Sequence, residues 1–203
     1  LMIVKNGAER IGKALASVVD LAKQIVVVDT GSTDRTPIIA SQFGAELYFY
    51  EWENDFSKAR NHGLFFARYP WVLVIDHDEE LNKQSFIQNA HLLEQPNVGG
   101  IRVHIVNHVK RGDSYTKTHH TYTRIFRNDP RIRFEGPIHE QIAQSILDAG
   151  FELIESDIMI DHYGYSTINI DKVSRNRKIL EKTLAENPDD DWSLFNLAET
   201  EFS

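Results

Sequence analysis

The chain has 203 residues, no cysteine and a formal net charge of −8. The length suits one domain with an appendage, and an apolar share of 41% suits a folded rather than a disordered protein. Without cysteine the chain forms no disulfide, cysteine zinc site, iron–sulfur cluster or thiol nucleophile. The acidic balance argues against non-specific binding to nucleic acid. The apolar runs are too short to span a membrane, so we expect no transmembrane segment and a cytoplasmic location.

The first 95 residues alternate between expected strands and helices. The run at 24–29 is mostly β-branched, which is typical of a strand buried on both faces of a parallel sheet. The expected strands are 2–5, 24–29, 47–50 and 71–75, and the expected helices are 9–21, 34–43 and 57–69. This order predicts an α/β fold with a mostly parallel open sheet and helices on both faces. Ligands bind such sheets at the carboxyl ends of the strands.

The chain changes character after residue 96. The later expected strands, which read as antiparallel, are 99–109, 115–127, 131–134 and 151–160. Two helices are then expected at 170–186 and 192–202, separated by Asn187-Pro188. We expect a domain over 1–165, in two halves (1–95 and 96–165), and a helical extension over 166–203 that could start a helical repeat. The chain opens on Leu1 directly into an expected strand, so we expect it to be part of a longer protein.

Two carboxylates, Asp76 and Asp78, follow the expected strand 71–75. Residues two apart in an extended segment point the same way, so the like charges call for a positive partner. A hard divalent cation is the simplest one, and it can bridge the phosphates of a nucleotide. An exposed acidic turn is the alternative. The position at the carboxyl end of a strand favours the metal.

Asp29 and Arg60 are further candidates. Asp29 ends the expected strand 24–29, where a carboxylate can accept hydrogen bonds from a base or a ribose, although an acidic turn before a helix is an equal alternative. Arg60 lies early in the expected helix 57–69 and can reach a phosphate or a carboxylate, with a surface ion pair as the alternative. The glycine pattern fits neither a dinucleotide fingerprint nor a P-loop.

Five motifs occur in order along the first 80 residues: MIVKN (2–6), VVVDTGSTDRT (26–36), FGA (43–45), WxxDFSxARN (52–61) and DHDE (76–79). Together they resemble family 2 glycosyltransferases of the GT-A fold. The resemblance is close over about the first 80 residues, and the later 136–142 and 162–165 resemble the subgroup with tetratricopeptide-like repeats, which is similar to peptide and protein S-glycosyltransferases.

The resemblance implies a nucleotide-sugar donor, usually a UDP-sugar, and Mn²⁺ or Mg²⁺ as the divalent metal. It implies that Asn6 lies near the base and that Asp29 contacts the uracil or the ribose. Arg60 and Asn61 match the segment that lines the nucleotide pocket. In the D-x-D motif, Asp78 is the expected metal ligand and Asp76 lies nearer the ribose, with the metal within reach of both.

The resemblance also implies inversion at the anomeric carbon, which requires a base beside the acceptor hydroxyl or thiol. The family's usual acidic pair followed by x-x-R-W is absent here. Glu140, or its neighbour His139, is the candidate base, with a helix start after Pro137 as the alternative. His162 is a candidate third contact to the metal or the diphosphate, since imidazole suits Mn²⁺, with a core histidine as the alternative.

The resemblance, together with these residues, implies a metal-dependent inverting glycosyltransferase that transfers a hexose. It also implies that 1–95 is the nucleotide-binding half and 96–165 the acceptor half. The rival enzyme is a sugar-1-phosphate nucleotidyltransferase, but Asn6-Gly7 makes a poor triphosphate loop. The third alternative is a non-catalytic transferase-like module that presents a helical repeat to a partner. The basic stretch 172–182, which includes Arg175 and Arg177, reads as a solvated face, with an anion contact as the alternative.

Overall fold

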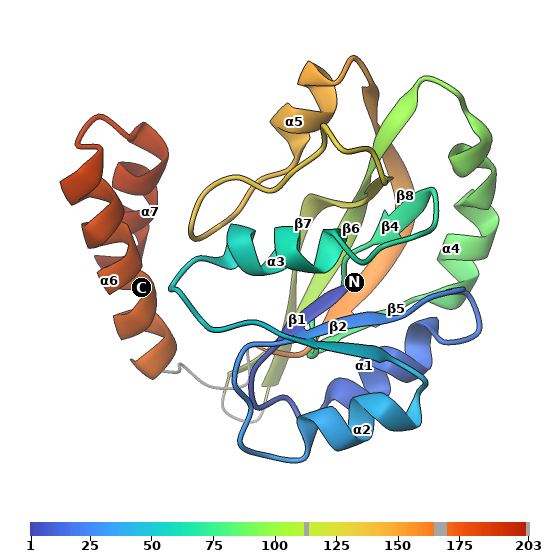
Figure 1. Cartoon of the computed structure of the whole chain (residues 1–203), viewed down its shortest axis with the longest axis horizontal. Helices are drawn as coiled ribbons and strands as arrows, with labels where there is room; N and C mark the ends of the chain where they lie inside the picture. The colour runs from blue at the N-terminus through green and yellow to red at the C-terminus, as the bar shows by residue number, and fades with distance from the viewer. Residues whose placement is uncertain (112–113, 165–169, 202–203) are drawn as a thin grey trace.

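The computed structural model describes residues 1–111, 114–164 and 170–201 (Figure 1). Its first sheet is parallel, in the order β1 (Met2–Val4), β2 (Val26–Asp29) and β3 (Glu46–Phe49). The central strand β2 is buried along its whole length. Its β-branched residues suit this position, because both of their faces meet packed helices.

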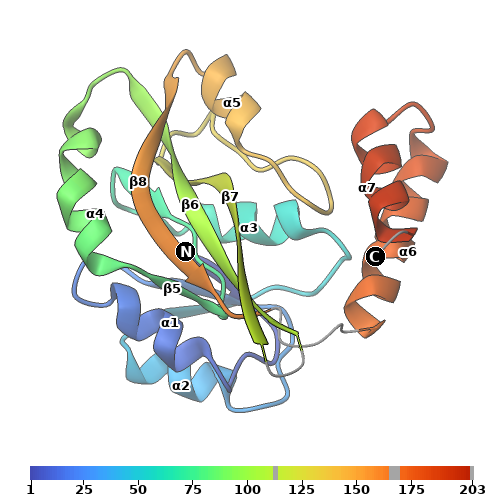
Figure 2. The ribbon, with the colours of Figure 1, turned by 180° about the vertical axis from the view of Figure 1, so that it is seen from behind.

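Helices cover both faces of this sheet, as the alternation of side chains along β2 requires. Val27 shares a core cluster with α1 (Ile11–Val18) and α2 (Thr36–Gln42). Val26 and Val28 point the other way and pack with Ala59 of α3 (Phe56–Leu64). Figures 1 and 2 show α1 and α2 together, with α3 on the opposite side. The predicted sheet with helices on both faces is confirmed.

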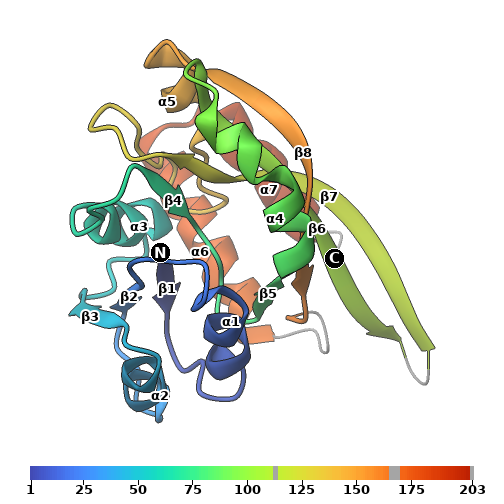
Figure 3. The same ribbon diagram turned by 90° about the vertical axis from the view of Figure 1, so that its right-hand side faces the viewer.

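The second sheet is longer and mostly antiparallel, in the order β4-β7-β6-β8-β5, and β6 pairs with β8 in parallel. Its strands are β4 (Trp71–Leu73), β5 (Glu79–Leu81), β6 (Val98–Arg111), β7 (Ser114–Arg127) and β8 (Glu152–His162). Three short helices accompany them: α4 (Lys83–Asn89), the 3₁₀ helix η1 (Ala90–Glu94) and α5 (Ala143–Asp148). Figure 3 shows β6 and β7 as a ribbon that runs out from the body of the molecule.

Two expected strands differ in the structure. The strand expected at 71–75 belongs to the second sheet, where β4 pairs antiparallel with β7. It still touches the first sheet, because the Leu73 carbonyl accepts a 2.8 Å bond from the Leu1 nitrogen and the Ile75 amide donates to the Leu1 carbonyl at 3.1 Å. The segment 131–134 forms no strand. The side chains of Asn61 and Ser145, rather than a neighbouring strand, form hydrogen bonds with its backbone amides and carbonyls.

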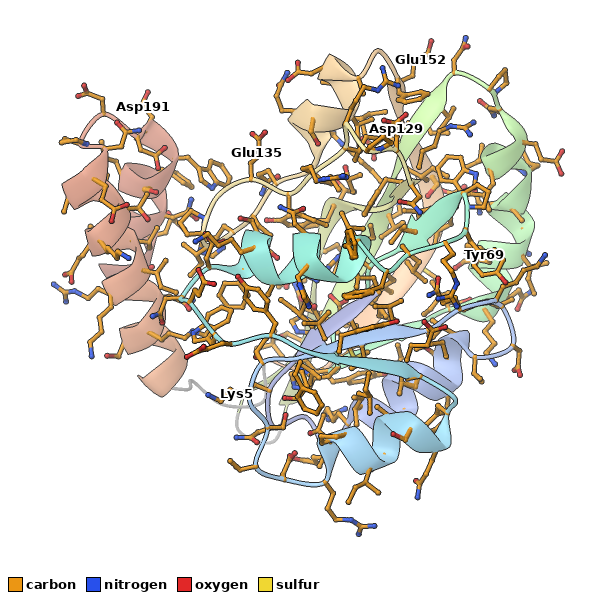
Figure 4. The ribbon with its side chains drawn as sticks, viewed as in Figure 1. Lys5, Tyr69, Asp129, Glu135, Glu152 and Asp191 are labelled. Carbon is orange, nitrogen blue, oxygen red and sulfur yellow. The ribbon has the colours of Figure 1, made fainter. Side chains whose placement is uncertain are left out.

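The helices α6 (Ile170–Glu186) and α7 (Asp191–Glu201) form a hairpin beside the two sheets (Figure 1). Asp191, labelled in Figure 4, begins α7. Ile179 and Leu180 of α6 are buried against Ile138, with Trp52 and Phe56 at the edge of the cluster. Two helices near the expected ranges are thus confirmed, whereas the division into domains stays a prediction. No helix among the described residues is long and apolar enough to cross a bilayer.

Candidate active site

The loop after β2 positions Asp29, which is 1% exposed. Its Oδ1 accepts hydrogen bonds from the amides of Gly31 at 2.8 Å and Ser32 at 2.7 Å. Gly31 has a φ of 101°, which a residue with a side chain rarely adopts. The Asp29 Oδ2 is buried and has no hydrogen-bond partner in the described structure. A buried acceptor of this kind calls for a donor, so the base or ribose contact stays a sound prediction.

Asn6 ties the first loop to the loop after β2. Its φ is 55°, in the left-handed region that asparagine tolerates. Its backbone amide donates to Ser32 Oγ at 2.8 Å, and its Oδ1 accepts from the Thr33 amide at 2.8 Å. These bonds bring the ends of β1 and β2 together. The expected place near the base stays a prediction.

Asp76 lies between Arg60, which is buried, and Arg124, which is partly buried. Arg60 Nη2 donates to one of its oxygens at 3.0 Å, and Arg124 Nη2 approaches the other at 3.5 Å. Burial alone would raise the pKa of the Asp76 carboxyl, but the charge of Arg60, followed by that of Arg124, outweighs burial and holds this pKa well below its usual value. We expected the D-x-D carboxylates to need a positive partner. For Asp76, arginine side chains are that partner.

Glu79 and Arg124 belong to this cluster, although the sequence analysis did not select them. Arg124 Nη2 donates to Glu79 Oε1 at 2.6 Å, and Glu79 Oε2 accepts from the Asp76 amide at 2.8 Å. Burial raises the pKa of the Glu79 carboxyl, which is 1% exposed. The signal in the sequence was the run of acidic residues at 76–80, which needs more than one cation. The partner strand that carries Arg124 could not be read from spacing.

Asp78 faces a different partner from Asp76. The chain turns at 77–78, so the two carboxylates do not share one face as expected for an extended segment. Asp78 Oδ2 lies 3.5 Å from His162 Nε2, and His162 Nδ1 lies 2.8 Å from Asn107 Oδ1. Burial by itself would raise the pKa of Asp78 and lower the pKa of His162. The hydrogen bond and the opposite charges of the pair outweigh burial, so the pKa of Asp78 is lowered and the pKa of His162 is raised.

The pair Asp78 and His162 fits a metal ion that is shared with a substrate. One carboxylate and one imidazole suit Mn²⁺. Next to them lies Gly164, where an added Cβ would stand 2.3 Å from Asp78 Oδ2 and 2.6 Å from His162 Nε2. In residues 1–111, 114–164 and 170–201, no three His, Asp or Glu side chains are grouped closely enough to hold an ion on their own. A metal here would need further ligands from phosphate or water.

Glu140 and His139 lie near Arg60 and Asp76, and all four residues line one cavity. Glu140 accepts a close hydrogen bond from Arg60 Nε. His139 has a φ of 52°, and burial lowers the pKa of its imidazole. Both lie on the loop before α5, on which Figure 4 labels Glu135. The helix start expected after Pro137 is not there, because α5 begins at Ala143. The role as base stays a prediction for both residues.

Asn61 braces the protein backbone. Its Nδ2 donates to the Phe134 carbonyl and its Oδ1 accepts from the Phe134 amide, both at 2.9 Å. These two bonds hold the segment 132–134 against α3 and set the start of the loop that carries Glu140. A contact of Asn61 with the nucleotide stays a prediction.

A cavity of about 310 Å³ joins these groups to the helical hairpin. Arg60, Asp76, Arg124, His139 and Glu140 line it together with α6, which contributes Arg175 and Asn176. Asp29, Asp78 and His162 do not line it. The predicted residues therefore fall into two groups, one around Asp76 and the cavity and one at the neighbouring strand ends.

The parallel sheet, the second curled sheet and the acidic strand ends define a GT-A fold. The profile of Glycosyl transferase family 2 matches residues 1–156, and the chain belongs to this family. The family predicted from the ordered motifs is thus confirmed.

Relatives and a solved structure agree with this assignment. The chain is 37% identical to a TPR repeat-containing protein of Synechococcus elongatus, covering 93% of this chain and 48% of that protein. It is 32% identical to the SPbeta prophage-derived glycosyltransferase SunS of Bacillus subtilis, covering 96% and 46%. The chain thus spans about half the length of these relatives. The glucosyl-3-phosphoglycerate synthase of Mycobacterium tuberculosis, solved with Mn²⁺, UDP and glucosyl-3-phosphoglycerate, shares the fold with a TM-score of 0.60 at 14% identity, covering 91% of this chain and 77% of that one.

Proposed function

We propose that this chain carries the catalytic site of a metal-dependent, inverting glycosyltransferase that uses a nucleotide-sugar, specifically a UDP-sugar donating a hexose. The observation that carries the proposal is the order of polar groups along the strand ends. A buried Asp29 with an open acceptor oxygen is followed by Asp76 on two arginines and by Asp78 against His162. Asp29 suits the nucleoside, Asp76 with its arginines suits the ribose side, and Asp78 with His162 suits the metal that accompanies a diphosphate.

The donor half of the site follows from these contacts. Asp29 Oδ2 accepts a hydrogen bond from the uracil or the ribose, and Asp76, held by Arg60, lies nearer the ribose. Asp78 and His162 hold Mn²⁺ or Mg²⁺. When bound, the ion neutralises the charge of the departing diphosphate. The solved synthase of similar fold was obtained with Mn²⁺ and UDP, which is consistent with this donor.

Glu140 is the base in this proposal. Arg60 bonds both Asp76 and Glu140, so one guanidinium sets the position of the ribose-side carboxylate and of the base. Glu140 takes the proton of the acceptor hydroxyl or thiol as the acceptor oxygen or sulfur bonds to the anomeric carbon. The bond from that carbon to the diphosphate oxygen breaks in line, which inverts the configuration. His139 is the second candidate, because its lowered pKa leaves it neutral and able to accept a proton at pH 7.

Calorimetric titration with UDP, with and without Mn²⁺, tests the donor half. We expect binding that depends on Mn²⁺ in the wild type and is lost in Asp78→Ala. The matched control is Asp20→Ala, which removes an exposed carboxylate paired with Lys83. Tighter binding of UTP than of UDP would favour the nucleotidyltransferase. Absence of nucleotide binding in a folded sample would favour the interaction module.

Donor hydrolysis tests the stereochemistry without a known acceptor. Slow transfer to water should release β-sugar from an α-linked UDP-hexose, and NMR of the fresh product distinguishes the two anomers. Release of α-sugar would contradict inversion. Glu140→Gln should lower this rate by about 10²-fold or more, as expected for loss of a general base.

A further inference from the structure

Arg175 reaches the cavity from α6, although the basic stretch 172–182 was expected to be a solvated face. Arg175 is partly buried, and its guanidinium carbon lies 5.0 Å from the centre of the Phe56 ring. Its side chain donates hydrogen bonds to Asn176 Oδ1, from Nε at 3.2 Å and from Nη2 at 2.9 Å. Arg177 fits the original expectation, because it is exposed and pairs with Glu181 at 2.8 Å.

The three arginines of the cavity differ in their partners. Arg60 pairs with Asp76 and Glu140, and Arg124 pairs with Asp76 and with Glu79, which lies behind the lining. Among the side chains that the structure describes, no carboxylate is within ion-pair distance of Arg175. A cation that is taken out of water without a counter-charge is unfavourable, and an anion in the cavity would relieve this cost.

Two more arginine side chains line the same cavity. Arg60 Nη1 and Arg124 Nε are buried and have no hydrogen-bond partner in the described structure, and both residues line the cavity with Arg175. The Arg60 side chain is only 7% exposed. Buried guanidinium groups with unused donors suit phosphate or carboxylate oxygens, which accept such bonds with a gain from charge.

The position of the cavity assigns the anion to the acceptor. The cavity contains both candidate bases, Glu140 and His139. Of the groups assigned to the donor, Arg60 and Asp76 line it as well, whereas Asp29, Asp78 and His162, which would hold the nucleoside and the metal, lie outside its lining. An anion that meets Arg175 is therefore on the side of the base.

We propose that Arg175 binds a phosphate or carboxylate group of the acceptor, so that the chain glycosylates an anionic acceptor. The identification of the ligand as an acceptor rests on the proposed transferase function, whereas the anion site itself does not. Arg175 thereby determines acceptor specificity from the same cavity that Glu140 lines.

NMR of the arginine side chains tests this with inorganic phosphate as the probe. The full chain, labelled with ¹⁵N-arginine and saturated with UDP and Mg²⁺, is titrated with phosphate. Arg175→Lys identifies the Nε signal of Arg175 by its loss, and Arg177→Lys identifies that of Arg177 as the matched control from the same helix. We expect phosphate to shift the Arg175 signal and to leave the Arg177 signal in place. Arg175→Gln should weaken phosphate binding about tenfold, in line with loss of a charge-assisted contact.

The other outcomes separate the possible sources of the anion. If phosphate moves no arginine signal, or moves the Arg177 signal equally, the proposal is wrong. If UDP itself shifts the Arg175 signal, and Arg175→Gln weakens UDP but not uridine, the anion is the donor diphosphate and the acceptor assignment is overturned. If UDP does not bind at all but phosphate still shifts the Arg175 signal, the transferase function fails and the anion site stands. The titration is carried out on the wild-type protein, so its result does not depend on whether a variant folds.

Discussion

Asp76 and Asp78 are two residues apart in the sequence and have different partners in the fold. Asp76 is bound by Arg60 and approached by Arg124, whereas Asp78 is next to His162. The first carboxylate is thus neutralised by the protein, and the second is the one to which we assign the metal in the proposed function. Arg60 joins Asp76 to Glu140. At this scale, the site depends on which cation each carboxylate meets.

Replacing Arg60 should test how much the buried ion pairs matter. In Arg60→Met the carboxylates of Asp76 and Glu140, which are 31% and 12% exposed, lose their closest cation. We expect a loss of about 3–5 kcal/mol in the free energy of unfolding, because removal of one partner leaves buried charge behind. Denaturation by urea measures it. Arg68→Met, which removes an exposed pair with Glu46, is the control and should change little. Equal effects of the two variants would contradict the prediction.

The His162 imidazole should titrate above its ordinary value of about 6.5 in metal-free protein. Asp78 favours the protonated ring and raises its pKa despite burial. The stabilisation is therefore full below the unfolded pKa and is lost as pH rises through the raised folded pKa. NMR of the ring in EDTA follows the titration. In Asp78→Asn the midpoint should fall; an unchanged midpoint would show that another group sets it.

At the scale of elements, a short segment can be positioned by hydrogen bonds from side chains of elements distant in the sequence. The segment 131–134 alternates in a way that favours a strand, but it has no neighbouring strand to pair with. Asn61 on α3 and Ser145 on α5 bond its backbone instead. This arrangement leads the chain from Phe134 into the loop that carries Glu140. The loop that presents the candidate base therefore depends on α3.

Asn61→Ala tests this dependence. It leaves the amide and the carbonyl of Phe134 without their partners, so we expect a loss of about 2 kcal/mol in the free energy of unfolding. Gln144→Ala, which removes an exposed bond to Asp148 on α5, should cost less than about 0.5 kcal/mol. Thermal or urea unfolding decides. A loss in Asn61→Ala no larger than in Gln144→Ala would show that solvent replaces both bonds.

At the scale of the whole molecule, α6 closes one wall of the cavity. It is held by the apolar contacts of Ile179 and Leu180 with Ile138. The helical hairpin thereby supplies Arg175 and Asn176 to a site whose other residues come from the two sheets. A helical extension expected to be an appendage is thus part of the cavity.

Leu180→Ala tests this docking. Leu180 is 0% exposed, and its truncation leaves a hole that should cost about 2–5 kcal/mol. Hydrogen exchange of the α6 amides should become faster by about 30-fold or more, the equivalent of ~2 kcal/mol, with less change in β2. Phe195→Ala, at a position that is 58% exposed on α7, is the control and should leave exchange in α6 nearly unchanged. Unchanged exchange in Leu180→Ala would mean that α6 is held elsewhere.

The sequence by itself determined the family, the α/β class, most of the helices and strands, and the rim of carboxylates. Apolar periodicity and ordered motifs are local properties, so 26–29 is identifiable as a buried strand, and Asp29, Asp76 and Asp78 are found at strand ends. Only the tertiary structure decided which charges meet. Arg124 joins Asp76 and Glu79 through the pairing of β4 with β7, and Arg175 enters the cavity through the docking of α6. These contacts join residues far apart in the chain, and spacing along a sequence holds no information about distance across a fold.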